Sequence, residues 1–318
     1  MSFTRDIADY PEGIVLAVDK PWRWTSADVI RKVKYAAIRH FGKKNLKVGH
    51  AGTLDPLAAG VLLVCIGNAC KRAQELQDHD KEYIARIRFG ATTPSYDLEK
   101  EVDRRFPFEH ISADAVRAAL PAFLGEQEQV APLFSAKSVD GVRAYELARK
   151  LYKAHLSGAS SVIPGADRES RFDAAALQTL HRSRITISGL ELLDFLPDSD
   201  GNRVRGDSVS LRSTPAPPTG CASGPLPLPS SGGGQAPRTL YPSPSSRIHV
   251  ADTSALGLPE AVIRIACSKG TYIRAFARDL GEALGTGAHL SGLVRTKTGA
   301  FRLEDALSLD AALALLSD

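Results

Sequence analysis

One carboxylate in this sequence stands where it could do chemistry. In the segment KVGHAGTLDPLAAGVLLVCIGNACK (47–71), Asp55 lies among glycines and a proline that favour a turn, and His50 lies five residues upstream. An apolar run from Val61 to Ile66 follows and anchors the loop to a strand or a buried helix. A carboxylate held in such a loop can act as a nucleophile. Because a lone aspartate on a loop is usually a turn residue or a helix cap, Asp55 by itself does not establish an enzyme.

The stretch before Asp55 is basic. From Val29 to Leu54 there is no acidic residue, although the whole chain has a net charge of only +4. The basic side chains of this block are Arg31, Lys32, Lys34, Arg39, Lys43, Lys44 and Lys47. Lysine and arginine neutralise phosphates and release counterions, so the block suits a polyanion such as RNA. The alternative is a solvated helix face, which is the commoner meaning of a basic run.

The elements on the N-terminal side of Asp55 follow from apolar spacing. A short apolar run covers 13–18, and Thr25 or Ser26 can cap the helix that comes next. That helix has apolar residues at helical spacing, namely Val29, Ile30, Val33, Ala37 and Phe41. The pattern predicts a strand and then a helix before the loop that holds Asp55.

Beyond Asp55, strands and helices interleave. Alternation over Tyr83–Phe89 predicts a half-buried strand whose outer face carries Arg86 and Arg88. Ser112 opens a helix that extends to Leu120, 261–267 is a strand, and 271–284 is a helix with one apolar face. The absence of a regular βαβ period favours an α+β fold, in which a mixed, largely antiparallel sheet packs against flanking helices.

Two stretches interrupt this ordered body. Ten of the nineteen prolines fall between Pro197 and Pro244, together with three consecutive glycines and many serines. Such a composition cannot bury enough apolar surface to offset its ordering entropy, so we expect 197–258 to be a disordered insertion. A second insertion of low order is expected over 154–182. The catalytic body would then comprise 1–153, 183–196 and 259–300, followed by a short C-terminal tail at 301–318.

Composition also limits the class of protein. No apolar run approaches the ~20 residues of a membrane span, and the N-terminus lacks the features of a signal peptide. The four cysteines fit neither a zinc site nor a disulfide framework, which favours reduced thiols in the cytoplasm. They are Cys65, Cys70, Cys221 and Cys267.

Five segments, in order, resemble the TruB family of tRNA pseudouridine synthases. GHAGTLDPLAAG is similar to the family signature, in which the aspartate of G-T-L-D-P is the catalytic carboxylate. DKPWRWTS (19–26) resembles the upstream K-P-x-G-x-T-S, and KEYIARIRFGATTPSYDLE (81–99) resembles the K-x-Y strand and its loop. APLFSAKSVDGVRAYELAR (131–149) and the 267–299 segment, which begins CSKGTYIRAFARDL, resemble the two distal elements. Five collinear matches are far more specific than one short motif.

The resemblance assigns roles to residues of this chain. It makes Asp55 the catalytic carboxylate, places Arg274 beside it as an ion-pair partner, and stacks Tyr83 on the target base. It places His50, Tyr272 and Leu293 around the target nucleotide, with Leu293 as an apolar surface. The RNA contacts that we expect outside the site are Lys20, Lys43, Lys44 and Lys47. Without the resemblance, Tyr83 would be an ordinary strand aromatic, Arg274 a solvated helix residue and Leu293 a core residue.

The implied reaction is the isomerisation of one uridine to pseudouridine in the T-loop of tRNA, at position 55. It breaks the bond from N1 to the ribose and rejoins the base through C5, so no redox cofactor and no metal are expected. The uridine lies inside a folded RNA loop and must be flipped into the pocket. The implied partner is tRNA, with no membrane, no obligatory protein partner and a monomeric enzyme.

Three departures from the family pattern and two rival functions remain. Arg23 stands where the motif has glycine, which would strain the backbone if the position needs a positive φ. Ala131 replaces a proline, and the chain ends soon after Gly299, where many relatives carry a fuller RNA-binding domain.

The rivals are a guide-RNA-dependent subunit like dyskerin and a non-catalytic module that binds or folds tRNA.

Overall fold

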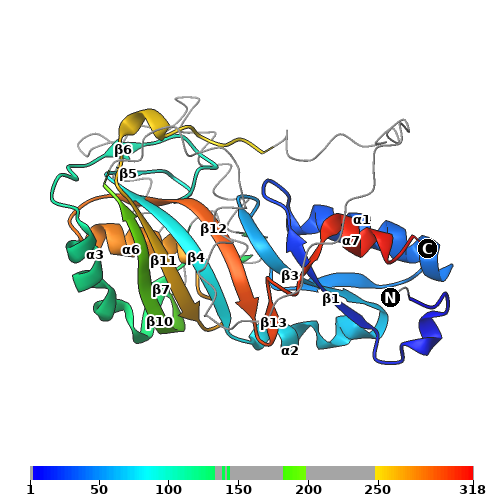
Figure 1. The fold of residues 1–318 in the computed structure, drawn as a ribbon. Coiled ribbons are helices and arrows are strands. Elements are labelled where there is room, and N and C mark those ends of the chain that lie inside the picture. Colours follow the sequence, from blue (N-terminus) through cyan, green and yellow to red (C-terminus); the bar gives the residue numbers. More distant parts are fainter. Residues whose placement is uncertain (1–2, 133–137, 140–141, 144–181, 198–247, 318) are drawn as a thin grey trace, which may run out of the picture.

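A large mixed sheet with helices against it forms the body of the protein (Figure 1). The computed structural model describes residues 3–132, 138–139, 142–143, 182–197 and 248–317. Within these residues, the strands of the main sheet follow the order β14-β1-β3-β12-β4-β11-β10-β7, with β2 added to β3 and β13 added to β12. The pairs β1–β14 and β12–β3 are parallel, and the other neighbours are antiparallel. The expected α+β fold with a mixed, largely antiparallel sheet is therefore confirmed.

The bounds of the elements are as follows. The strands are β1 (Ile14–Lys20), β2 (Val48–Ala51), β3 (Ala58–Ile66), β4 (Lys81–Phe89), β5 (Ala91–Thr92), β6 (Arg104–Arg105), β7 (Gly125–Val130), β8 (Ser138–Val139), β9 (Val142–Arg143), β10 (Arg182–Leu196), β11 (Glu260–Cys267), β12 (Ala288–Thr298), β13 (Phe301–Arg302) and β14 (Leu307–Ser308). The α-helices are α1 (Ser26–Phe41), α2 (Ala73–Asp78), α3 (Ala113–Ala119), α6 (Ile273–Ala283) and α7 (Leu309–Ala314). Short 3-10 turns cover Ile7–Asp9, Gly67–Arg72, Leu120–Phe123 and Ser254–Leu256.

Helix α1 begins and packs as its sequence predicts. Thr25 is the N-cap, and it forms a reciprocal capping box with Asp28 that satisfies backbone N–H groups at the start of the helix. Val29, Val33 and Ala37 are fully buried against the central strand β3. Every residue of β3 is buried, because alternate side chains pack into the core under α1 and into a second core on the other face of the sheet. This two-sided burial fixes β3, and with it the loop that precedes it.

Helix α6 belongs to the same core as α1 but packs on the neighbouring strands β12 and β4 of the sheet. Its apolar residues Ile273, Phe276 and Leu280 join the same core as the row Tyr83, Ala85, Ile87 and Phe89 on β4, which confirms the predicted inner face of that strand. The predicted outer face is wrong in one respect. Arg88 is only 2 % exposed, because Glu260 on the neighbouring strand β11 pairs with it. Arg86, two residues away, also contacts Glu260 and keeps partial exposure.

The two strands on either side of the proline-rich stretch, β10 and β11, pair with each other. Leu196, at the end of β10, pairs with Glu260, at the start of β11, so the two strands form the two arms of an interrupted antiparallel pair. Residues 248–258, which we expected to belong to the disordered insertion, instead pack on the body, with Ala251, Thr253 and Leu258 buried. A composition average hides these few anchoring residues behind their proline-rich neighbours. The expectations for 154–181 and 198–247, and for most of the 131–149 motif, lie outside the described residues, and the division into domains stays a prediction.

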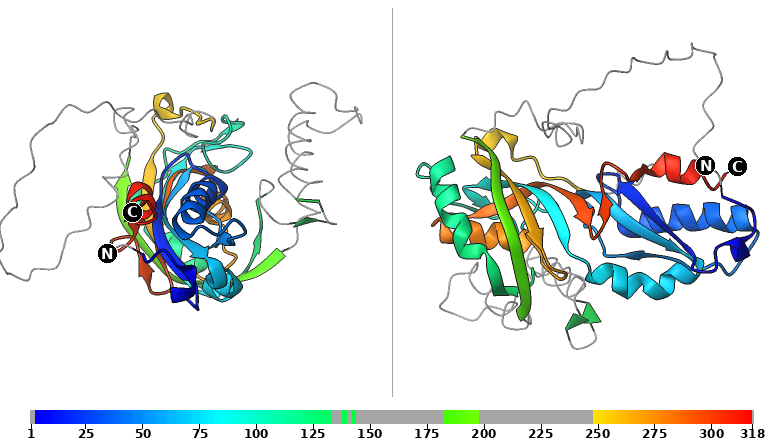
Figure 2. Two further views of the ribbon diagram at one scale, coloured as in Figure 1. Left: turned by 90° about the vertical axis from the view of Figure 1, so that its right-hand side faces the viewer. Right: turned by 60° about the horizontal axis from the view of Figure 1, so that its bottom comes forward.

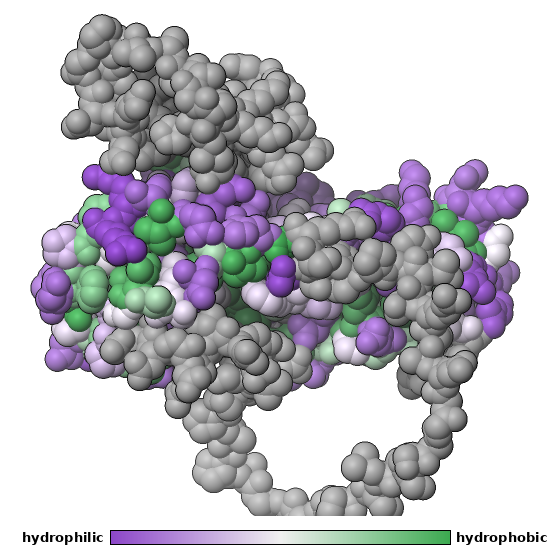
Figure 3. Space-filling model, turned by 90° about the horizontal axis from the view of Figure 1, so that it is seen from above, coloured by the Kyte–Doolittle hydropathy of each residue, from purple (hydrophilic) through white to green (hydrophobic). Residues whose placement is uncertain are grey.

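The short C-terminal stretch at 301–318 packs on the body of the protein. β14 pairs in parallel with β1, and α7 packs on α1 and β1, with Leu309, Ala312 and Leu316 buried. Figure 2 places α1 and α7 at the same end of the molecule. Seen from above, hydrophilic residues project at this end, and hydrophobic residues are scattered between polar ones along the middle (Figure 3). None of the described helices combines the length and the apolar character that a membrane span requires.

Candidate active site

The loop that carries Asp55 is held in place through its backbone. The Ser26 hydroxyl, at the start of α1, donates to the Leu54 carbonyl (3.0 Å) and accepts from the Leu54 N–H (2.9 Å). The fully buried Arg295, on β12, donates to the Gly52 carbonyl (3.0 Å) and to the Val61 carbonyl (2.7 Å). Gly52 has a φ of 91°, which favours glycine at this position. Contacts from α1 and from β12 therefore hold the backbone of the loop that carries Asp55.

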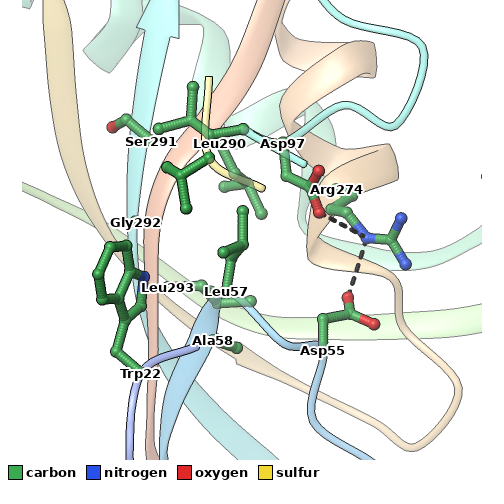
Figure 4. A pocket seen from close by; sticks show the side chains of 12 residues that line it. Trp22, Asp55, Leu57, Ala58, Asp97, Arg274, Leu290, Ser291, Gly292 and Leu293 are labelled. Carbon is green, nitrogen blue, oxygen red and sulfur yellow. Dashed lines mark hydrogen bonds and ion pairs between the residues drawn. The ribbon is translucent and has the colours of Figure 1, made fainter. Parts of the chain in front are cut away.

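Asp55 forms an ion pair with Arg274, in the first turn of α6 (Figure 4). The Arg274 Nε donates to Asp55 Oδ2 at 2.9 Å, across 219 positions of the sequence. The arginine side chain is 6 % exposed, whereas the Asp55 side chain is 39 % exposed. The contact that we expected is present, and the expectation of a solvated Arg274 is excluded. A carboxylate that is oriented by a buried guanidinium and yet open on one side is the arrangement that a reacting group requires.

Two further carboxylates, which the sequence analysis did not single out, surround Arg274. Asp97 is 5 % exposed, and its Oδ2 lies 3.8 Å from the Arg274 Nε; Ser95 Oγ donates to the other oxygen at 2.6 Å. Burial raises the pKa of Asp97 and also that of Glu99. Burial opposes the charged form of Arg274, but Asp55, Asp97 and Glu99 outweigh it and raise the pKa of the guanidinium. Asp97 could have been recognised from the sequence, because it lies in the turn after the Tyr83 strand, inside a segment that resembles the family.

A buried glutamine fixes the start of α6. Gln129, on β7, accepts from the Tyr272 N–H (2.8 Å) and donates to the Tyr272 carbonyl (3.1 Å). Tyr272 is the N-cap residue of α6, although its side chain makes no capping hydrogen bond. The Arg274 guanidinium also donates to the Ser95 carbonyl (3.2 Å), so its position is fixed by this bond as well as by Asp55. Tyr272 thus lies next to the ion pair along the chain, but it does not line the pocket.

Asp55 and Arg274 line a small pocket together with residues of four other segments. The lining residues are Trp22, Asp55, Leu57, Ala58, Asp97, Leu98, Val250, Arg274, Leu290, Ser291, Gly292 and Leu293. Leu293, which was predicted to contact the base, sits at the middle of the sheet, where β12 pairs with Ala58 of β3 and Ala85 of β4. The cavity volume is about 20 Å³, which is room for one water molecule.

Tyr83 has Asp55 as a charged neighbour, but neither Tyr83 nor His50 lines this pocket. Tyr83 is 8 % exposed on β4, where burial raises its phenol pKa and Arg295 and Asp55 are its charged neighbours. His50, on β2, is half-buried, and its pKa is lowered by burial and by the charge of Arg295. Its Nδ1 is buried and finds no hydrogen-bond partner among the described residues. Arg295, another residue that the sequence analysis missed, thus connects the Asp55 loop, Tyr83 and His50.

The four lysines expected to contact RNA fall into two groups. Lys43, Lys44 and Lys47 are exposed between α1 and β2. The expectation that Lys20 contacts RNA is wrong, because its side chain is 0 % exposed and cannot reach a phosphate. Its Nζ donates to the carbonyls of Pro21 (3.0 Å), Trp24 (2.5 Å) and Pro56 (3.5 Å), and burial lowers its pKa to about 7. Lys20 is instead a brace between the 21–24 turn and the Asp55 loop.

Two non-glycine residues with a positive φ border the pocket. Arg23 has a φ of 62°, so the position at which the family motif has glycine does require the left-handed region. Tyr96 has a φ of 56° and lies between Ser95 and Asp97, which both contact Arg274. These are the two such residues in the described part of the chain. Backbone strain of this kind persists where the surroundings over-determine it, which is common at functional sites.

Comparisons with known proteins give the family of the chain. The family model for the N-terminal domain of TruB family pseudouridylate synthases matches residues 39–168, and the model for the tRNA pseudouridylate synthase B C-terminal domain matches 274–317. A tRNA pseudouridine synthase B of Phocaeicola vulgatus is 41 % identical over 95 % of this chain and 92 % of its own length. One of Flavobacterium johnsoniae is 34 % identical over 95 % of each chain.

A solved structure shares the fold. It is described as the crystal structure of a Cbf5-Nop10-Gar1 complex, and the match has a TM-score of 0.52 and 20 % identity over 97 % of this chain. This chain spans 56 % of the length of that one. Together with this fold, the family models and the relatives identify the chain as a pseudouridine synthase. The chain belongs to the TruB family of pseudouridylate synthases.

Proposed function

We propose that this protein converts a single uridine in the T-loop of tRNA, at position 55, to pseudouridine. The observation that carries the proposal is the Asp55–Arg274 pair at the wall of a pocket in the middle of the sheet. Its support from relatives is that similar proteins named tRNA pseudouridine synthase B cover nearly the whole chain.

The residues around the pocket suit each stage of such a reaction. Asp55 attacks C1′ of the ribose or the uracil ring, the N1–C1′ bond breaks, and the base rejoins through C5. The C5 proton leaves and N1 gains a proton, so atoms and electrons balance without a cofactor. Arg274 orients the carboxylate by its 2.9 Å hydrogen bond, and Leu293 gives the base an apolar surface. Tyr83 supplies an aromatic ring beside Asp55 on which the base stacks.

The proposed substrate is recognised as an anion as well as a base. Lys43, Lys44 and Lys47 lie on the segment between α1 and β2, which leads directly into the Asp55 loop. Their exposed ammonium groups can contact backbone phosphates around the flipped nucleotide. We propose that the protein acts on tRNA alone in the cytoplasm, as a monomer and without a guide RNA.

The test is to incubate the purified protein with an unmodified transcript of a tRNA and to map pseudouridine at single-nucleotide resolution. No other protein and no guide RNA are added. We expect one modified position, in the T-loop. A transcript with cytidine at that position is the control, and it should gain no pseudouridine. Modification at other positions alone, or none until a guide RNA is supplied, would refute the proposal.

A further inference from the structure

An exposed tryptophan stands at the rim of the catalytic pocket. Trp22 lines the same pocket as Asp55 and Arg274, yet it is 40 % exposed. In Figure 4 its indole ring lies next to Gly292 and Leu293, across the pocket from the ion pair. A large aromatic ring on an open rim gains little from burial, and nothing in the chemistry at Asp55 assigns it a role.

The turn that carries Trp22 is tied to the catalytic loop. The Trp24 N–H donates to the Pro21 carbonyl (3.3 Å), which closes the turn around Trp22. The Arg23 N–H donates to the carbonyl of Pro56, the residue after Asp55, at 3.0 Å. The buried Lys20 donates to carbonyls on both sides of this contact. The indole is therefore held at a fixed place relative to the catalytic carboxylate.

A neighbouring arginine orders the ring itself. The Arg23 guanidinium lies 5.5 Å from the centre of the Trp22 ring, within the range of a cation–π contact. Arg23 Nη2 also donates to the Ile248 carbonyl at 2.6 Å, so the guanidinium is anchored. Ordering an exposed aromatic side chain in advance reduces the entropy that binding a flat partner would cost.

The size of the pocket says which partner fits the rim. The pocket is small, with a cavity volume of about 20 Å³, so it offers no room for a second base beside the flipped one. A nucleotide next to a flipped uridine loses a stacking neighbour and stays outside the pocket, where aromatic side chains commonly take the place of the lost base. Resting on the proposed function, we propose that Trp22 is a substrate-binding residue whose indole stacks on a nucleobase that flanks the target uridine.

Fluorescence can locate the contact without turnover, because the chain has two tryptophans, Trp22 and Trp24. In a Trp24→Phe protein, Trp22 is the sole emitter, and a T-loop RNA hairpin should quench it through base stacking. In a Trp22→Phe protein, Trp24 is the sole emitter, and the phenyl ring still permits binding; the same hairpin should leave its emission almost unchanged. No quenching in the Trp24→Phe protein at RNA concentrations that saturate binding would overturn the proposal.

Steady-state kinetics give the second arm. Loss of one base–aromatic stack corresponds to about a 5- to 100-fold change in binding, so Trp22→Ala should raise KM for tRNA by that factor and leave kcat nearly unchanged. Tyr35→Ala is the matched control, because Tyr35 is 65 % exposed on α1 and also faces an arginine, but lies outside the pocket lining. An unchanged KM in Trp22→Ala, or an equal rise in Tyr35→Ala, would overturn the proposal. If instead the wild-type protein modifies no tRNA, the proposed function fails, and the fluorescence result still decides whether Trp22 contacts RNA.

Discussion

Two arginine–carboxylate clusters on one sheet differ in a way that separates function from stability. On the outer face of β4 and β11, Glu260 is 2 % exposed by side chain, and both of its oxygens are occupied by Arg86, Arg88 and Ser291. On the inner face, Asp55 contacts Arg274 through one hydrogen bond and is 39 % exposed. Both clusters join segments more than 170 positions apart in the chain.

The difference teaches how to recognise the reacting group. Glu260 is buried, and each of its oxygens already accepts a hydrogen bond from the protein, so this cluster is suited to holding strands together rather than to binding a substrate. A carboxylate that is oriented on one side and open on the other can act on a substrate. Removing a charge should therefore cost stability at Glu260 and catalysis at Asp55. The following predictions test that contrast.

The largest effect on stability is expected at Glu260. Glu260→Gln leaves the buried Arg88 without a counter-charge, so the free energy of unfolding should fall by about 3–5 kcal/mol, measured by urea denaturation. The folded fraction should keep its activity. Glu191→Gln is the control: its ion pair with Arg264 is exposed, and its loss should cost no more than about 1 kcal/mol. Equal losses in the two variants would remove the distinction between the clusters.

The reverse pattern is expected at Arg274. Arg274→Gln removes the group that orients Asp55, and kcat should fall by about 10²–10³-fold, the usual cost of losing one oriented group in an active site. Binding of tRNA should change by only a few-fold. The control is Arg278→Gln. Arg278 lies one turn further along α6, pairs with Asp279 and does not contact Asp55, so its loss should leave kcat unchanged. Full activity in Arg274→Gln would show that Asp55 does not depend on the pair.

The basic segment should affect binding alone. Changing Lys43, Lys44 and Lys47 together to alanine should weaken tRNA binding and reduce the slope of log K against log[salt] by about 2 to 3, since each lost phosphate contact contributes about 0.7–0.9. The rate at saturating tRNA should hardly change. The control is the double change of the exposed Arg104 and Arg105 on β6. If the triple variant keeps the slope of the wild type, the segment is a solvated face and the RNA path runs elsewhere.

The smallest effect concerns the strained turn beside the pocket. Arg23→Ala and Arg23→Gly both lose the hydrogen bond to the Ile248 carbonyl, but only glycine accepts a φ of 62° without a steric cost. The glycine variant should therefore be more stable than the alanine variant by about 1 kcal/mol in thermal or urea unfolding. The opposite order would mean that the backbone at this position relaxes away from the left-handed region.

Local patterns predicted the elements well, because their causes are local. The Thr25 cap, the apolar spacing of α1 and the inner row of β4 depend on neighbours a few residues away, and the structure confirms them. The resemblance to the family supplied what such patterns cannot. Asp55 and Arg274 are 219 positions apart, and no spacing rule brings them together.

The errors share a long-range cause. Lys20 was expected to contact a phosphate because it is a lysine, but its ammonium group is enclosed by carbonyls of two loops. Arg88 was expected to face solvent because its partner, Glu260, lies 172 positions away. Residues 248–258 were grouped with the proline-rich stretch, although Ala251 donates to the Leu98 carbonyl and is buried. Each of these depends on tertiary partners that composition and periodicity do not encode.

The most direct test of the account is the rate of pseudouridine formation by Asp55→Asn under single-turnover conditions, with the protein in excess over tRNA. Asparagine keeps the size of the side chain and can still accept from Arg274, but it has no negative charge with which to act as a nucleophile. We expect the rate to fall by at least about 10³-fold, while the Kd for tRNA stays within a few-fold of the wild type. A rate within about tenfold of the wild type would contradict the assignment of Asp55 as the catalytic carboxylate.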